Sequence, residues 1–203
     1  MVNDSPYRGS GQLTRQQFLF YEMRTTARLM ANGLTDKEIL NRIKGENLYQ
    51  YPTLNTIGQV ASGCIARLHA MDDENLVITL AQADSITAKQ ICLYAMMKQF
   101  RLVRDFMITV IGTKYRQQDF TFSRREINVF FLQLQEQDDV VASWSFETVK
   151  KLESVISRVL IENEYIDNAK STILKPVLIA KELEEAIRIS GEMIYLSAFN
   201  CLY

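Results

Sequence analysis

The sequence predicts an all-α fold, a compact helical globule that contains helix-turn-helix units. Of its 203 residues, 47% are hydrophobic and 23% are charged, which is ordinary for a globular protein. The chain holds only 8 Gly and 3 Pro, fewer than strand-rich folds with frequent tight turns usually need. A small β wing near residues 165–175 is the one exception that the sequence favours.

Three capping boxes predict where helices begin, because hydroxyl and carboxyl or amide side chains there bind free backbone N–H groups. They are Thr14-x-x-Gln17, Thr35-x-x-Glu38 and Ser123-x-x-Glu126. The first predicts a helix over residues 15–32 that stops at Gly33, since glycine adopts the left-handed conformation that ends helices. The second predicts a helix over residues 36–44.

A third helix is expected after the polar residues 45–51, with Pro52 in its first turn. Apolar residues at spacings of three and four predict about 16 helical residues, and they are Leu54, Ile57, Ala61, Cys64 and Leu68. The opposite face is polar but uncharged and carries Asn55, Gln59, Ser62 and His69. Arg67 is expected to lie to one side of that face.

The middle of the chain predicts a short helix over residues 75–83 and then a long one that Ser85 opens. An apolar stripe along the long helix marks it as the central core helix. The stripe consists of Leu93, Met97, Phe100, Val103, Met107 and Val110.

The last third predicts a winged helix-turn-helix. Its parts are a helix over residues 124–136, a turn at Asp138 and Asp139, and a helix over residues 146–163 capped by Ser145. Residues 165–166 and 173–174 flank a polar stretch that favours a wing hairpin. Two amphipathic helices are expected over residues 177–203, parted near Gly191. We therefore expect three units, at residues 1–84, 85–122 and 123–203.

Several classes of protein are excluded by what the sequence lacks. His69 is the single histidine, and Cys64, Cys92 and Cys201 are far apart, so no metal site or catalytic cluster is expected. No phosphate-binding loop of nucleotide hydrolases is present. The start of the chain lacks a secretory signal, and no apolar run is long enough to cross a bilayer. We expect a cytoplasmic protein that is not an enzyme and has no cofactor.

Net charge is −1, but the basic residues are unevenly distributed. Residues 1–70 hold eight Lys or Arg against five acids, and residues 98–125 hold seven against two. Local basic surface binds phosphates even where the whole chain is close to neutral.

Several short motifs, taken in order, resemble the BrxA family of bacterial BREX phage-defence systems. They are Glu46-Asn47-Leu48-Tyr49-Gln50-Tyr51-Pro52-Thr53, Ala66-Arg67-Leu68, Lys98-x-x-Arg101-Leu102-Val103-Arg104-Asp105-Phe106, Val141-x-x-Trp144-Ser145-x-x-Thr148-x-x-Lys151-Leu152 and Leu160-x-Glu162-Asn163-x-Tyr165. The resemblance implies a helical protein with helix-turn-helix motifs and positive surface that binds double-stranded DNA without cutting or modifying it. It also implies an accessory role beside other BREX subunits, among them a methyltransferase and an ATPase.

The leading hypothesis is therefore a monomer that binds duplex DNA, with cations on phosphates and polar side chains on base edges. The candidate residues are Arg42, Lys44, Thr53, Asn55 and Gln59 in the first unit and Lys150, Lys151, Arg158 and Lys170 in the last. An alternative is a protein adaptor that docks through the acidic helix over residues 181–188. A third is RNA binding through the basic faces.

Overall fold

The computed structural model describes residues 5–201, and every regular element within them is a helix. In chain order the elements are η1 (Arg8–Thr14), α1 (Phe20–Ala31), α2 (Asp36–Glu46), α3 (Leu54–Ala70), α4 (Glu74–Gln82), α5 (Ser85–Gln99), α6 (Arg101–Asp105), η2 (Phe106–Ile111), α7 (Gly112–Arg116), α8 (Arg124–Gln137), α9 (Asp139–Ala142), α10 (Phe146–Glu162), α11 (Lys181–Ser190) and η3 (Met193–Phe199). η1 and η3 are 3-10 helices and η2 is π-helical. The predicted all-α class is confirmed.

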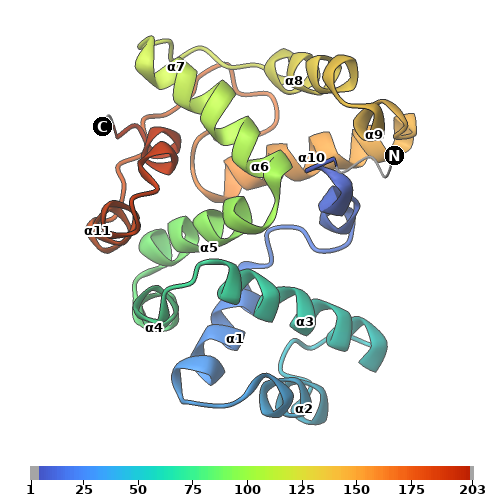
Figure 1. Ribbon diagram of the computed structural model, residues 1–203, viewed down its shortest axis with the longest axis vertical. Helices are drawn as coiled ribbons and strands as arrows, with labels where there is room; N and C mark the ends of the chain where they lie inside the picture. Colours follow the sequence, from blue (N-terminus) through green and yellow to red (C-terminus); the bar gives the residue numbers. More distant parts are fainter. Residues whose placement is uncertain (1–4, 202–203) are drawn as a thin grey trace.

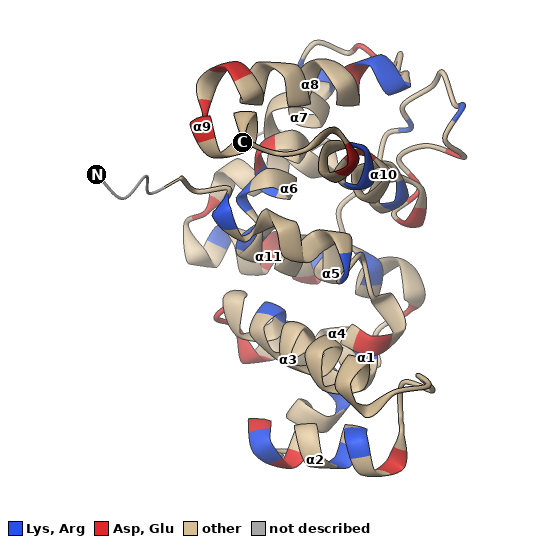
Figure 2. Ribbon diagram, turned by 90° about the vertical axis from the view of Figure 1, so that its right-hand side faces the viewer, with Lys and Arg blue, Asp and Glu red and all other residues tan. Residues whose placement is uncertain are grey.

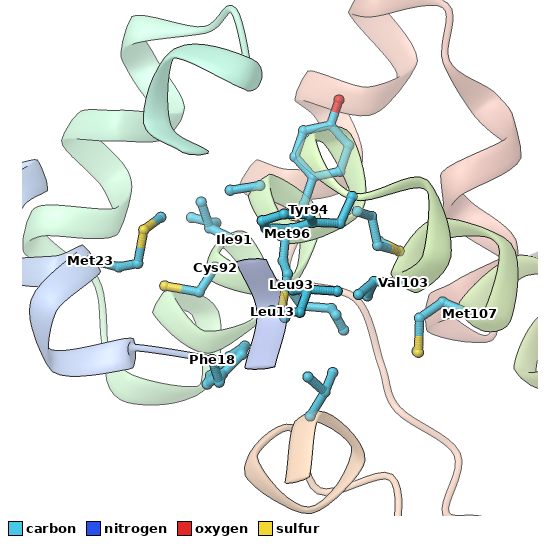
Figure 3. Packing of buried hydrophobic residues seen from close by; sticks show 14 of the residues in the cluster. Leu13, Phe18, Met23, Ile91, Cys92, Leu93, Tyr94, Met96, Val103 and Met107 are labelled. Atoms are coloured by element: carbon cyan, nitrogen blue, oxygen red, sulfur yellow. The ribbon is translucent and has the colours of Figure 1, made fainter. Parts of the chain in front are cut away.

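Helix α5 lies at the centre of the molecule. Every residue from 90 to 97 is buried, as expected for a helix that neighbours surround on all sides. Figure 3 shows Cys92 and Leu93 of α5 close to Leu13 of η1 and Phe18, while Val103 and Met107 lie on the other side. In Figure 1, α1 to α4 lie below α5, and α7 to α10 lie above it.

The predicted caps of α2 and α8 are confirmed. Thr35 and Glu38 form a complete capping box, and so do Ser123 and Glu126. Helix α3 begins at Leu54 with Thr53 as its N-cap, so the placement of Pro52 inside the first turn was wrong. Leu54, predicted to face inward, is 65% exposed because it stands at the solvent end of α2 and α3.

The prediction of a helix from residue 15 was wrong. Thr14 ends η1, and α1 begins only at Phe20, after an extended segment. The Arg67 guanidinium donates hydrogen bonds to the carbonyl oxygens of Gln16, Gln17 and Phe18. The bonds to Gln17 and Phe18 span 2.7 and 3.3 Å. These carbonyls are therefore not available for helical hydrogen bonds.

Arg67 was expected to lie to one side of the polar face of α3, and this prediction was wrong. It is fully buried, has no carboxylate partner, and lies 5.2 Å from the centre of the Phe100 ring. Burial lowers the pKa of its guanidinium, but three carbonyl oxygens and the ring face solvate the charge. An uncompensated buried charge is costly, so the hydrogen bonds of Arg67 to residues 16–18 offset the cost of burying its guanidinium.

The single long helix predicted from Ser85 is interrupted. Phe100 adopts an extended conformation with φ −117° and ψ 105°, which ends α5 and caps α6. Its ring then lies against Arg67, a long-range contact that local periodicity does not reveal. Beyond α6 the helix widens into the π-helical turns of η2.

The predicted wing hairpin was also wrong, because no β-strand occurs within residues 5–201. Ile173 instead forms an isolated antiparallel bridge with Thr121, ahead of α8. Leu174 N–H donates to the Phe120 carbonyl over 2.8 Å, and Lys175 N–H donates to the Tyr165 carbonyl over 2.8 Å. Residues 167–172 therefore form a loop, and the residues just after it are hydrogen-bonded to Phe120 and to Tyr165.

At the C-terminal end, α11 stops at Gly191 with φ 74°, as the glycine predicts. The second expected helix is the 3-10 helix η3. The outer ends of the first and last predicted units, residues 1–4 and 202–203, lie outside the described residues. Among the described helices, none combines the length and the apolar character that crossing a membrane requires.

Candidate nucleic-acid interface

The first candidate surface lies on α2 and α3, which pack together at one end of the molecule (Figure 2). We call it the α3 surface, and its predicted members are Arg42, Lys44, Thr53, Asn55 and Gln59. Asn55 and Gln59 are exposed one helical turn from each other on α3. Their amides can therefore donate to and accept from a ligand at the same time.

The remaining members of the α3 surface are partly engaged with the protein. The Thr53 hydroxyl accepts from the Thr56 N–H over 3.4 Å and donates to the Thr56 hydroxyl over 2.8 Å. Arg42 pairs with Glu46 over 3.2 Å, with both side chains half exposed. Lys44 crosses onto α3 over Gly58, where an added Cβ would lie 2.5 Å from its Cε. This surface is thus rich in amides and poor in free cations.

The second candidate surface lies on α10 and the loop after it, and we call it the α10 surface. Its predicted members are Lys150, Lys151, Arg158 and Lys170. Lys151 and Lys170 are exposed, and neither forms an ion pair with another described residue. Arg158 donates to the side-chain oxygen of Gln17. Lys150 pairs with Glu153 over 3.1 Å and lies 5.3 Å from the centre of the Phe146 ring.

The role of Glu153 as a partner of the basic residues was not predicted from the sequence. Only 5% of its side chain is exposed, and it accepts from Lys150 over 3.1 Å and from Arg124 over 3.3 Å. Its position would have been visible in the inward spacing of Val149, Leu152 and Ile156, since residue 153 belongs to the same face. Glu153 therefore holds two cations beside α10.

Basic side chains of α8 join those of α10 on one side of the molecule. A groove of about 340 Å³ lies between the start of α8, α10 and the loop after it. Arg124 and Arg158 line the groove, and Arg125 is exposed beside Arg124. Figure 2 shows basic positions of α8, α10 and this loop in the same upper part of the molecule. The arrangement favours contact with an anion longer than one phosphate.

Residues 15–19 link η1 to α1, and carbonyl oxygens of this segment accept hydrogen bonds from Arg67. The segment connects the two surfaces, and we call it the strap. Gln16 donates through Nε2 to the Gln59 carbonyl over 2.9 Å. Gln17 accepts from Arg158. The strap thus joins α3 to α10. Lys44 lies against α3 at Gly58, whereas Arg42 pairs with Glu46 on α2, and Lys170 lies in the loop after α10.

The single histidine and the three cysteines of the chain all lie within the described residues. No group of three or more His, Cys, Asp or Glu side chains within residues 5–201 is arranged to hold a metal ion. His69 lies 3.0 Å from Asp36 on the surface. Cys64 and Cys92 are buried as predicted, and burial raises the pKa of the Cys64 thiol to about 12, so it stays protonated.

Comparison with known proteins identifies the class to which this helical chain belongs. Residues 6–191 match the model of the BrxA family. A protein of Bacillus cereus (strain H3081.97) named BREX protein BrxA is 32% identical, and the match covers 97% of each chain. A BREX protein BrxA of Paramagnetospirillum magneticum (strain AMB-1) is 27% identical over 84% of this chain and 85% of its own. The chain therefore belongs to the BrxA family of BREX proteins.

A solved structure supports the fold. The crystal structure of an uncharacterized protein from Magnetospirillum magneticum superposes with a TM-score of 0.80. The match covers 93% of this chain and 96% of the other, at 23% sequence identity. The arrangement of helices is therefore shared at low sequence identity.

Proposed function

We propose that this protein is a non-catalytic accessory of a BREX phage-defence system that binds double-stranded DNA. The observation that carries the proposal is the group of cations around α10 and the groove beside it. Arg124, Arg125, Lys151 and Lys170 come from three separate segments, α8, α10 and the loop after α10, and all four are exposed. Such a patch suits the repeated phosphates of a duplex, which supply most of non-specific affinity.

The order of elements also supports this proposal. Helix α8, the short α9 and α10 follow one another as the helices of a helix-turn-helix do, and the loop at residues 167–172 stands where a wing would. In this arrangement α10 enters the major groove while Lys170 contacts the backbone. The α3 surface then supplies a second contact through Asn55 and Gln59.

The accessory role is part of the same proposal. The relatives carry the name BREX protein BrxA, and no group of three or more His, Cys, Asp or Glu side chains within residues 5–201 is arranged to hold a metal ion. We propose that methyltransferase and ATPase subunits of a BREX system supply methyl transfer and ATP hydrolysis, and that this protein positions DNA for them in the cytoplasm.

The test is a fluorescence anisotropy titration of mixed-sequence duplexes at about 50 and 200 mM salt, the range over which counterion release changes affinity most. Reversing Lys150 and Lys151 to Glu should weaken binding at least about tenfold and reduce the salt slope by about two. The matched control is Lys181→Glu, an 84% exposed lysine on α11 that should leave binding unchanged. Equal affinity of all three proteins would remove the α10 surface from the proposal.

A second candidate function is a protein adaptor. Leu178 and Ile189, beside and on α11, are 84% and 87% exposed, which favours protein contact at that end. The acids of α11 are less available than the sequence suggests, since Glu184 pairs with Arg188 and Glu185 pairs with Lys181. Absence of duplex binding at low salt, together with BREX subunits that co-purify only when Leu178 and Ile189 are intact, would favour this function.

A further inference from the structure

A second groove runs along the strap, between the α3 surface and the α10 surface. It has a volume of about 500 Å³ and lies between the start of α1, Tyr51 and the middle of α10. Its lining includes Arg15, Gln17, Phe20, Tyr21, Tyr51 and Arg158. Figure 1 shows the strap passing from η1, beside α10, down to α1. The groove has the volume of sites that hold small molecules, about 300–1,000 Å³.

Aromatic rings form one side of this groove and are held in fixed positions. Phe20 packs against the buried Phe18, with ring centres 6.5 Å apart and planes 13° apart. Tyr21 is 52% exposed, and its hydroxyl donates to the Leu48 carbonyl over 3.0 Å. The Tyr51 hydroxyl donates to Glu22, and burial and that carboxylate raise the pKa of Tyr51, so it stays neutral. Lys89 also lies 5.8 Å from the centre of the Phe20 ring, so Phe20 is engaged with the protein, and Tyr21 and Tyr51 are the rings left to contact a flat ligand.

Arginines lie on either side of the rings. Arg15 is exposed and forms no ion pair with another described residue. Arg158 lies across the groove and is oriented by Gln17. Of the two acids in the lining, Glu162 lies 3.7 Å from Lys89 and Glu22 accepts from the neutral Tyr51 hydroxyl. Neither acid forms an ion pair with Arg15 or Arg158, so both guanidinium groups can contact an anionic ligand.

We propose that this groove binds unpaired nucleotides, whose bases stack on Tyr21 and Tyr51 while their phosphates contact Arg15 and Arg158. Proteins that bind single-stranded nucleic acid combine these same two elements, aromatic platforms and a basic path. A duplex keeps its bases stacked on one another and cannot offer them to these rings. The site shares Arg158 with the α10 surface, but Arg15 and Tyr21 belong to neither duplex surface, so changes at these two residues test this site without altering the residues proposed for the duplex.

The groove favours nucleotides over a peptide. An acidic peptide would contact the arginines but would leave the aromatic faces without flat partners, and a basic peptide would be repelled by Arg15 and Arg158. A nucleotide places one base and one phosphate at short, regular spacing, which matches rings and arginines that line the same groove.

The experiment measures binding of short fluorescent oligonucleotides to the full chain at low salt. We expect binding of oligo-dT or oligo-U, and their relative affinities show whether the deoxyribose or ribose strand is preferred, since only the 2′-OH and a methyl group differ. An abasic strand of the same length should bind about tenfold more weakly, because stacking is lost. Equal binding of the abasic strand, or no binding of any strand, would overturn the proposal.

Variants separate stacking from other effects. Tyr21→Ala should weaken oligonucleotide binding about tenfold, whereas Tyr21→Phe, which loses only the hydrogen bond to Leu48, should bind like the parent protein. Arg15→Gln changes an exposed side chain and should weaken oligonucleotide binding, so it tests the site even if Tyr21→Ala does not fold. Duplex binding should remain unchanged in all three. Equal loss in Tyr21→Phe and Tyr21→Ala would contradict the stacking role.

Discussion

The two candidate surfaces differ in what they offer a ligand. The α3 surface exposes the amides of Asn55 and Gln59, while Arg42 is paired with Glu46. The α10 surface exposes Lys151 and Lys170 and holds further cations against the buried Glu153. Amides suit base edges, whereas cations suit phosphates. Under the proposed function, this difference predicts that α3 contributes specificity for base edges and α10 contributes affinity for phosphates.

The largest expected effect concerns the strap, which joins both surfaces through Arg67. Arg67→Met removes the buried charge, which is favourable, but leaves the carbonyl oxygens of residues 16–18 without their donors. Because three buried acceptors lose their partner, we expect the free energy of unfolding to fall by about 2–3 kcal/mol.

Urea titration followed by circular dichroism measures this change. The control is Lys37→Met, an exposed lysine of α2 whose loss should alter stability by less than about 0.5 kcal/mol. Duplex and oligonucleotide binding should weaken together in Arg67→Met, since the strap positions Gln59 and Arg158. An unchanged urea midpoint would show that the strap keeps its place without the buried arginine.

A smaller effect is expected at Glu153, which restrains the α10 surface. Glu153→Gln removes a nearly buried negative charge and releases Lys150 and Arg124 toward solvent. Glu147→Gln makes the same change of charge at an exposed position of the same helix, where no ion pair is broken. We expect duplex affinity at low salt to rise roughly fivefold in the first variant and roughly twofold in the second. Equal gains would mean that only net charge matters.

The helices could be predicted from the sequence wherever their signals are local. The capping boxes of Thr35 and Ser123 were correct because both halves of each box lie three residues apart. The same pattern at Thr14 did not start a helix, because Arg67 donates hydrogen bonds to carbonyl oxygens of the following segment, among them that of Gln17, 50 positions earlier. The tertiary contact of the buried Arg67 side chain therefore outweighed the local capping pattern at Thr14.

The site was predictable only in part, for the same reason. Helical periodicity placed Asn55, Gln59 and Lys151 on exposed faces, where the structure has them. It could not reveal that Arg158 contacts Gln17, which lies 141 residues earlier. Nor could it bring Tyr21 and Tyr51 into one groove with Arg15, since that requires the path of the strap.

The smallest expected effect distinguishes structural from binding roles at the start of each helix. Thr53 was predicted to bind DNA, yet its hydroxyl both accepts from and donates to Thr56, as the Ser145 hydroxyl bonds to Thr148 at the start of α10. Thr53→Ala and Ser145→Ala should each lower the free energy of unfolding by about 1 kcal/mol through loss of an N-cap. Duplex affinity, measured by anisotropy at a temperature where both variants are folded, should change less than twofold because the hydroxyls are already engaged. A severalfold loss of affinity in Thr53→Ala alone would instead place the start of α3 in contact with DNA and make the two surfaces more alike than their charges suggest.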